Sequence, residues 1–236
     1  MKQLLDGDFA PLTHSWGFLE APLQVVGDAL YKWTSSNANK VTIEPFQASL
    51  TESLFRLEPL TMPPRKKLLM QTVSVWTAYF DNGATGGDPE SAVGYLAEVL
   101  KCRALAVACV PHTLLSERKD AKGTYGAVQF QLFAPERREF LNYERSISAA
   151  NDGGRWVFNA TGTVQPFEKT TNYEAPRIRN RFTPEMLEEY CAALEISLFA
   201  ADFSGPGAIL IKVHDPLPAH HPVLTLTEAR MKLGLE

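Results

Sequence analysis

The sequence predicts an α+β fold with a largely antiparallel sheet and helices packed on one face of that sheet. Helix patterns and strand patterns come in separate runs rather than in strict alternation, which is typical of α+β proteins. Residues 125–168 read as successive strands with turn residues between them, as in an antiparallel meander. Hydrophobic residues make up 45% of the 236 residues and charged residues 21%, so the chain is able to bury a core.

Two helices are predicted in the first quarter of the chain. One begins at Leu23, directly after Pro22, and repeats apolar residues at spacings of three and four as far as Trp33. The other is short and follows a capping-box pattern formed by Ser49 and Glu52. Both signals indicate amphipathic helices that bury one side.

Three further helices are predicted from their start signals. Asp88-Pro89 and Thr183-Pro184 each place a capping residue before a proline, which suits the first turn of a helix. Apolar residues recur at helical spacing after both dipeptides. A second capping box, Thr225 to Glu228, predicts a short terminal helix closed by Gly234.

The predicted strands lie between these helices. Leu68–Phe80 is rich in β-branched and aromatic residues, and Ala104–Val110 is a short apolar run. From Tyr125 onward, apolar and polar residues alternate, which places one face of the strands against a core and leaves the other wetter. Asn151–Gly154 has the residues of a tight hairpin, and Asn159–Gly162 is interpreted as a second turn.

We expect a single α+β domain over residues 1–236. Residues 1–115 and 124–213 are candidate sub-halves, because the loop 112–123 is the best boundary between them. Residues 214–236 are rich in proline and histidine at their start and are expected to form an extended tail with a short terminal helix.

Charge and cysteine content narrow the class of function. The formal net charge is −4, so no excess of positive charge favours nucleic acid as a partner. Three cysteines are too few for a disulfide framework and fit a reducing compartment. The first twenty residues lack the basic and apolar regions of a signal peptide, and no run reaches the roughly 18 apolar residues of a membrane span. We therefore expect a cytoplasmic protein that does not enter a membrane.

No cofactor or metal site is expected. Cys102, Cys109 and His112 form a C-x6-C-x2-H pattern. The two cysteines bracket a predicted strand, which would separate them by about 20 Å at roughly 3.3 Å per residue. Ligands of one tetrahedral zinc ion normally lie two to four residues apart on a turn, so the pattern is interpreted as core cysteines in a strand.

The loop Gly83–Asp88 could hold a phosphate, because it joins a strand to the N-terminus of a helix. It lacks the Lys-Ser/Thr of a phosphate-binding loop, and Asp88 places a negative charge where the phosphate would lie. Asp81 precedes the loop, with Glu144 and Glu168 as conceivable carboxylate partners. This arrangement gives the alternative hypothesis, an enzyme acting on a small molecule or phosphate ester, with a carboxylate near Asp81 and an anion-binding arginine.

Two basic segments stand out. Arg177, Arg179 and Arg181 alternate, and an extended backbone would align their guanidinium groups on one side, a geometry that suits carboxylates or phosphates. The alternative for these arginines is a solvated basic edge or a set of salt bridges to the acidic surface of the chain. The second segment, Arg65–Lys67, is interpreted as a solvated entry to the following strand.

Three segments together resemble a family of uncharacterised bacterial proteins, a domain of unknown function. They are Trp76–Asn82, Ile147–Phe158 and Pro166–Glu168, and the similarity extends from about Gly17 to Phe203. The order of a tryptophan-containing strand, a glycine-rich hairpin and an arginine-rich segment is also similar to that of toxin-immunity proteins. That resemblance implies an α+β protein of the cytoplasm that neutralises a protein partner without catalysis, and it transfers no functional residue.

The leading hypothesis is therefore a non-catalytic intracellular protein-binding module that uses the face of its antiparallel sheet, and an immunity-like protein is one form that this hypothesis takes. Tyrosine, tryptophan and arginine dominate the energetics of protein interfaces. A homo-oligomer is a further alternative, since exposed strands can pair across a symmetry axis. The candidate residues for binding a partner or ligand are Trp76, Tyr79, Asp81, Arg155, Tyr173, Arg177 and Arg179.

Overall fold

The computed structural model describes residues 2–114, 122–136 and 142–235. The strands are β1 (Ser15–Leu19), β2 (Val41–Gln47), β3 (Leu60–Thr61), β4 (Lys66–Thr72), β5 (Thr77–Asp81), β6 (Ala104–Val110), β7 (Ala127–Phe133), β8 (Tyr143–Asp152), β9 (Arg155–Gly162), β10 (Ser204–Val213) and β11 (Val223–Leu224). The α-helices are α1 (Leu23–Ser36), α2 (Leu50–Phe55), α3 (Pro89–Leu100), α4 (Pro184–Ala192) and α5 (Leu226–Lys232). Short 3-10 helices are η1 (Leu4–Gly7), η2 (Thr170–Glu174), η3 (Ile178–Asn180) and η4 (Ala201–Phe203).

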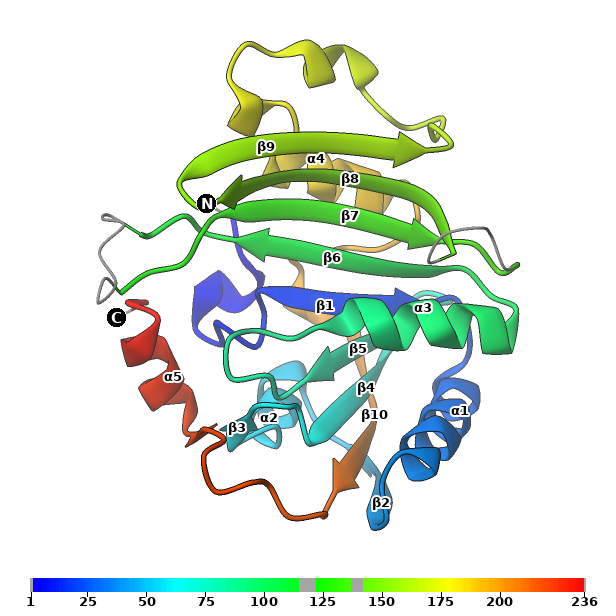
Figure 1. Cartoon of the computed structure of the whole chain (residues 1–236). Coiled ribbons are helices and arrows are strands. Elements are labelled where there is room, and N and C mark those ends of the chain that lie inside the picture. The colour runs from blue at the N-terminus through cyan, green and yellow to red at the C-terminus, as the bar shows by residue number, and fades with distance from the viewer. Residues whose placement is uncertain (1, 115–121, 137–141, 236) are drawn as a thin grey trace.

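Among these residues, nine strands form one sheet in the order β2-β10-β4-β5-β1-β6-β7-β8-β9. Every pairing in it is antiparallel. The sheet is strongly twisted. In Figure 1, β6 to β9 run across the view, whereas β4 and β10 run at a steep angle to them. The α+β class and the antiparallel sheet are thus confirmed.

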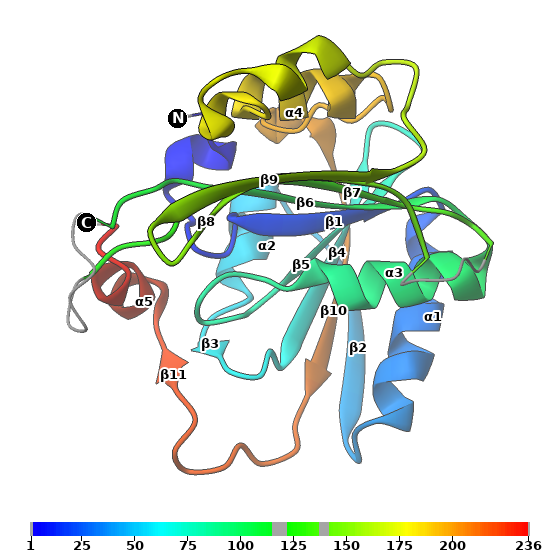
Figure 2. The ribbon, with the colours of Figure 1, turned by 45° about the horizontal axis from the view of Figure 1, so that its top comes forward.

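Helices lie on both faces of the sheet, which corrects the expectation of one covered face (Figure 2). Leu30 of α1 and Leu96 of α3 belong to the core on one face. Leu187 of α4 belongs to the larger core on the other face, together with residues of α2 and α5. The reason is visible in β4, where the consecutive residues Leu68 and Leu69 are both fully buried and point to opposite faces. Since central strands are apolar on both sides, both sides need cover.

The predicted helix starts are confirmed. α1 begins at Leu23 after Pro22, and the Ser49–Glu52 capping box is present in full at α2. The Thr183 side chain accepts a hydrogen bond from the Met186 N–H at the start of α4. α5 begins with the Thr225–Glu228 capping box, and β11, directly before this helix, pairs with β3.

Two strand predictions are corrected. Leu68–Phe80 is not one strand but the hairpin of β4 and β5, and residues 73–76 between them leave the sheet with Val73 72% exposed. Asn159–Gly162 is not a turn, because β9 continues to Gly162 in pairing with β8. The Asn151–Gly154 hairpin is confirmed, with Gly153 and Gly154 at φ of 56° and 88°.

The two candidate sub-halves contribute strands to the same sheet. β10 lies near the end of the second half, yet it pairs with β2 and β4 of the first half. The predicted boundary loop 112–123 falls partly outside the described residues, since 115–121 lie beyond them. Within the described residues, no helix is long and apolar enough to cross a membrane.

The outer strands β8 and β9 are covered by helices on only one side in the part of the chain that the structure describes. In Figure 1, α4 lies behind these strands and the segment before it rises above β9, while α3 crosses the front of the sheet at β1 and β6. The front side of β8 and β9 carries Ser146, Ser148, Asn159 and Thr161, which are half-buried or exposed. The wetter face predicted for the meander is therefore the polar front side of β8 and of the edge strand β9.

Candidate functional site

The structure divides the seven candidate residues into a buried group and an exposed group. Trp76, Tyr79 and Asp81 are each 2% exposed, and Tyr173 is 8% exposed. The exposed candidates are Arg155, Arg177 and Arg179. A partner that approached the folded chain would meet the second group and not the first.

Trp76 and Tyr79 fill the core. The Trp76 Nε1–H donates to the carbonyl oxygen of Leu194 at 2.8 Å, which ties the β4–β5 hairpin to the end of α4. Tyr79 packs under α1 and α3 in the core on the other face, and burial raises the pKa of its hydroxyl well above the usual value. Both aromatic side chains serve packing in this structure, and neither reaches the surface proposed for it from the sequence.

Asp81 holds the glycine-rich loop. Its carboxylate accepts hydrogen bonds from the Gly83 N–H at 2.9 Å and from the Asp88 N–H at 3.1 Å, at the start of α3. The N–H groups that could bind a phosphate therefore point to the chain's own carboxylate. Burial raises the pKa of Asp81 to about 6, against the opposing effects of the two N–H groups and of Lys67.

The shifted pKa values of Asp81 and of the buried His14 predict opposite changes of the free energy of unfolding with pH. The folded chain binds the Asp81 proton more tightly than the unfolded chain, whose pKa is near 3.8, so this contribution to stability is lost as pH rises from about 4 to about 6. Burial lowers the pKa of His14 from 6.5 to about 4, so its contribution rises over the same interval. The two contributions, each on the order of 2 kcal/mol, nearly cancel in the wild-type chain.

Asp81→Asn is expected to remove the contribution of Asp81 to stability, which decreases as pH rises. Relative to wild type, its free energy of unfolding then rises by about 2 kcal/mol between pH 4 and pH 6. His14→Gln is expected to fall by a similar amount over that interval. Urea unfolding at several pH values measures both, and parallel curves for the wild type and the two variants would contradict the assignment.

Tyr173 belongs to a buried polar network rather than to a surface. Its hydroxyl donates to Glu168 Oε2 at 2.8 Å and lies 3.2 Å from the Tyr190 hydroxyl. Glu168 in turn receives two hydrogen bonds from Arg145 on β8, from Nε at 2.9 Å and from Nη2 at 2.6 Å. This network fastens the segment after β9 onto the meander, and Glu168 lies on the opposite face of the sheet from Asp81. The two carboxylates do not form a catalytic pair.

Arg155, Arg177 and Arg179 meet at one end of the outer strands. Together with Gly154, Trp156 and Ile178 they line an open depression of about 520 Å³, which we call the arginine surface. It lies where the β8–β9 hairpin turns, against η3, which contacts both strands. Arg155 lies 22 residues before Arg177 in the sequence, and the fold brings it beside Arg177 and Arg179 at one depression.

Local structure explains why these side chains point outward. The hairpin turns tightly because Gly153 and Gly154 adopt positive φ, and the Gly154 N–H donates to Asn151 Oδ1 at 2.8 Å. The arginine segment is not extended, because residues 178–180 form a 3-10 turn. Arg181 consequently departs from the predicted row of three: its Nε donates to the Ala175 carbonyl at 2.9 Å, and it fixes the segment instead of joining the surface.

The three guanidinium groups of the arginine surface form no ion pair within the described residues, although Asp152 lies opposite Arg155 across the hairpin. The ion pairs found there join Lys2, Arg103, Arg145, Lys169 and Lys212 to glutamates, and none includes Arg155, Arg177 or Arg179. Trp156 is half-buried beside them and packs edge-on against the His112 ring at 5.8 Å. Three arginines and a half-buried tryptophan thus line one open depression, on a chain whose formal net charge is −4.

The cysteines are separate free thiols, with Cys109 buried in β6 and Cys102 half-buried after α3. Burial raises the pKa of Cys102 to about 11 and that of Cys109 to about 12. Among the described residues, no group of three or more histidine, cysteine, aspartate or glutamate side chains is placed to hold a metal ion.

Comparison with protein-family models, with curated proteins and with solved structures finds no match to this chain. The resemblance to toxin-immunity proteins therefore stays a prediction. The assignment of a function depends on the geometry of the chain itself.

Sequence reasoning missed Trp156 and Ile178 as members of the arginine surface. The alternation of β9 placed Trp156 on the same side as Phe158, which predicts a core position rather than a rim position. The prediction that the segment Arg65–Lys67 is solvated was also wrong for Lys67. Lys67 is half-buried, and its pKa is lowered mainly by burial.

Proposed function

We propose that this chain is a non-catalytic binding protein that engages an acidic surface of a protein partner through the arginine surface. The observation that carries the proposal is the convergence of Arg155, Arg177 and Arg179, without a carboxylate partner among the described residues, around Trp156 and Ile178. Arginine and tryptophan are enriched among the residues that dominate interface energies. Planar guanidinium groups also suit the carboxylates of aspartate and glutamate.

The shape of the site supports a macromolecular partner. Small-molecule sites enclose most of their ligand, whereas the arginine surface is an open depression at the molecular surface. A stable interface covers about 800 Å² on each partner, more than this depression alone offers. We expect the contact to continue along the uncovered side of β9, where Val157, Asn159 and Thr161 follow Arg155 on the same face.

The alternative enzyme hypothesis receives less support. It places Asp81 and the Gly83–Gly87 loop at an active site, but the Asp81 side chain is 2% exposed and both of its oxygens accept hydrogen bonds from the chain's own N–H groups. The anion-binding arginines of the hypothesis lie on the arginine surface, against β9, and four strands separate β9 from β5 in the sheet.

The proposal is tested by affinity capture from the native host's lysate, followed by identification of the bound protein and purification of that protein. The purified partner is expected to bind the wild-type chain stoichiometrically, to carry an acidic surface, and to lose affinity for Arg177→Glu. Capture of nucleic acid, or of proteins that bind wild type and Arg177→Glu equally, would contradict the proposal.

A further inference from the structure

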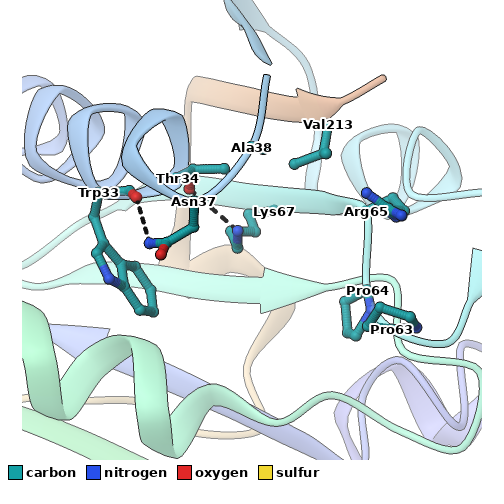
Figure 3. A pocket seen from close by; sticks show the side chains of 9 residues that line it. All are labelled: Trp33, Thr34, Asn37, Ala38, Pro63, Pro64, Arg65, Lys67 and Val213. Carbon is teal, nitrogen blue, oxygen red and sulfur yellow. Dashed lines mark hydrogen bonds between the residues drawn. The ribbon is translucent and has the colours of Figure 1, made fainter. Parts of the chain in front are cut away.

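A second cationic site lies on the side of the sheet that α1 and α3 cover, apart from the arginine surface. A cavity of about 380 Å³ opens between the end of α1 and the start of β4. Figure 3 shows Lys67 inside it, with Trp33 on one side and Arg65 and two prolines on the other. Thr34 and Asn37 of α1 complete the polar part of the wall.

Two cations enter this cavity from the same stretch of chain. Arg65 and Lys67 are two residues apart at the start of β4, so their side chains leave on the same face. Burial lowers the pKa of Lys67, the Asp81 carboxylate opposes that effect, and the nearby Arg65 guanidinium adds to the lowering. Placing two like charges together in a partly desolvated cavity is unfavourable unless an anion joins them.

Among the described residues, the hydrogen-bond partners of these two groups are neutral and neither group forms an ion pair, although the carboxylates of Asp215 and Asp81 act on Arg65 and Lys67 from farther away. Lys67 Nζ donates to Thr34 Oγ1 at 3.1 Å, and Arg65 Nη2 donates to the Pro216 carbonyl at 3.2 Å. Arg65 Nε is buried and has no hydrogen-bond partner among the described residues. The nearest acidic influence on Lys67 is Asp81, whose oxygens are already bound by the N–H groups of the glycine loop. The buried Arg65 Nε–H group is therefore a hydrogen-bond donor without an acceptor among the described residues.

The remaining walls are flat and apolar. One face of the Trp33 ring stacks on Tyr95, with ring centroids 4.8 Å apart and an interplanar angle of 24°. Lys67 Nζ lies 5.8 Å from the centre of the same indole ring. Pro64, beside Pro63, faces the cavity from the other side. Rigid aromatic and proline walls suit a compact planar group.

We infer that this cavity binds a small organic oxyanion, in which a carboxylate or phosphate group contacts Arg65 and Lys67 and a compact aromatic body lies against Trp33. The volume, near the lower end of the range for small-molecule sites, limits the ligand to about the size of one ring with its acid group. Carboxylates and phosphates share the chemistry that two neighbouring cations recognise. The site is independent of the arginine surface and of the proposed protein partner.

The test uses phenyl phosphate and benzoate as the two oxyanions, benzyl alcohol as the neutral match and inorganic phosphate as the anion without a ring. Isothermal titration of the wild-type chain is expected to give saturable binding of at least one aromatic oxyanion, with a Kd between about 10 μM and 1 mM. Binding of benzoate alone assigns a carboxylate ligand, and binding of phenyl phosphate alone assigns a phosphate ester. Equal affinity for inorganic phosphate or for benzyl alcohol would overturn the inference.

Lys67→Met and Arg65→Met are each expected to weaken that binding at least about tenfold, since each removes one charge and keeps most of the apolar stem. Lys32→Met is the matched control, because Lys32 is exposed on the same helix as Trp33 and does not line the cavity. Its Kd should stay within about twofold of wild type.

A measurement on the wild-type chain makes the inference independent of how the variants fold. Titration of the ¹⁵N-labelled chain is expected to shift the amide signals of Thr34, Asn37 and Lys67 at the same ligand concentrations that saturate the calorimetric signal. Shifts at residues 154–156 and 177–179 instead, or no saturable shift up to about 10 mM ligand, would overturn the inference.

Discussion

Arg145→Met is expected to lower the free energy of unfolding by about 3–5 kcal/mol. The Arg145–Glu168 ion pair is almost completely buried, with side-chain exposures of 4% and 0%. Removing the guanidinium group leaves the Glu168 carboxylate in the core without its cation, and a buried uncompensated charge is one of the most costly defects that a substitution introduces. Urea or thermal unfolding of the purified variant measures the loss.

A matched pair on the surface provides the control. Arg103 contacts Glu20 with the same two-bond geometry, at 2.7 and 2.8 Å, but with side-chain exposures of 41% and 30%. Arg103→Met is therefore expected to cost no more than about 1 kcal/mol, because water screens the exposed pair. Equal losses for Arg103→Met and Arg145→Met would contradict the structural role assigned to the buried network.

The double variant Arg145→Met/Glu168→Gln separates the charge from the hydrogen bonds. Glu168 also accepts from the Tyr173 hydroxyl and from the Gln165 N–H. Glutamine keeps an acceptor oxygen for one of these donors and removes the unpaired charge, so the double variant is expected to regain part of the stability that Arg145→Met loses. The network also anchors the segment that carries Arg177 and Arg179, the residues on which the proposed function depends.

The second large effect is on partner affinity. Arg177→Glu is expected to raise the Kd for the acidic partner at least about 30-fold, equivalent to about 2 kcal/mol. The substitution removes an attraction and introduces a repulsion at the centre of the arginine surface. Because Arg177 is exposed and has no ion pair among the described residues, the stability of the chain should be nearly unchanged. Surface plasmon resonance with the purified partner measures the association and dissociation rates.

Lys232→Glu is the control for Arg177→Glu. It makes the same change in net charge at an exposed position of α5, outside the arginine surface. Its Kd is expected to stay within about twofold of wild type at a physiological ionic strength, where long-range effects are screened over about 8 Å. If both variants weaken binding equally, net charge and not the arginine surface governs the interaction.

Local signals in the sequence were sufficient for the helices. A capping residue followed by proline fixes the first turn of α3 and α4, and apolar spacing of three and four fixes their buried sides. The meander from β6 to β9 was also predictable, because alternation and the Gly153-Gly154 turn act over neighbouring residues.

The strands β1, β2 and β10 were not predicted, although β1 is the centre of the sheet. β1 has five residues and includes Gly17, so it has neither the length nor the alternation of a recognisable strand. Its neighbours β5 and β6 are far away in sequence. Such non-local pairing also joins β10 to β2, and no local pattern records it.

The sequence was sufficient to predict the basic character of the candidate site, but not which residues make up the site. Arg155, Arg177 and Arg179 were all candidates from the sequence, and the structure adds Trp156 and Ile178 to the depression that they line. The aromatic residues Trp76 and Tyr79 have the composition of both interface and core, so only the fold could assign them to the core. Lys67 lies in a cavity because α1 packs beside β4, which a basic tripeptide alone does not reveal.

The most direct test of the central claim is hydrogen–deuterium exchange of the chain with and without its purified partner. The account predicts slower amide exchange in the complex at residues 153–157 and 177–181, with continuation along β9 and little change in α1 and α5. Protection confined to another surface, with residues 153–157 and 177–181 exchanging as in the free chain, would contradict the assignment of the arginine surface as the binding site.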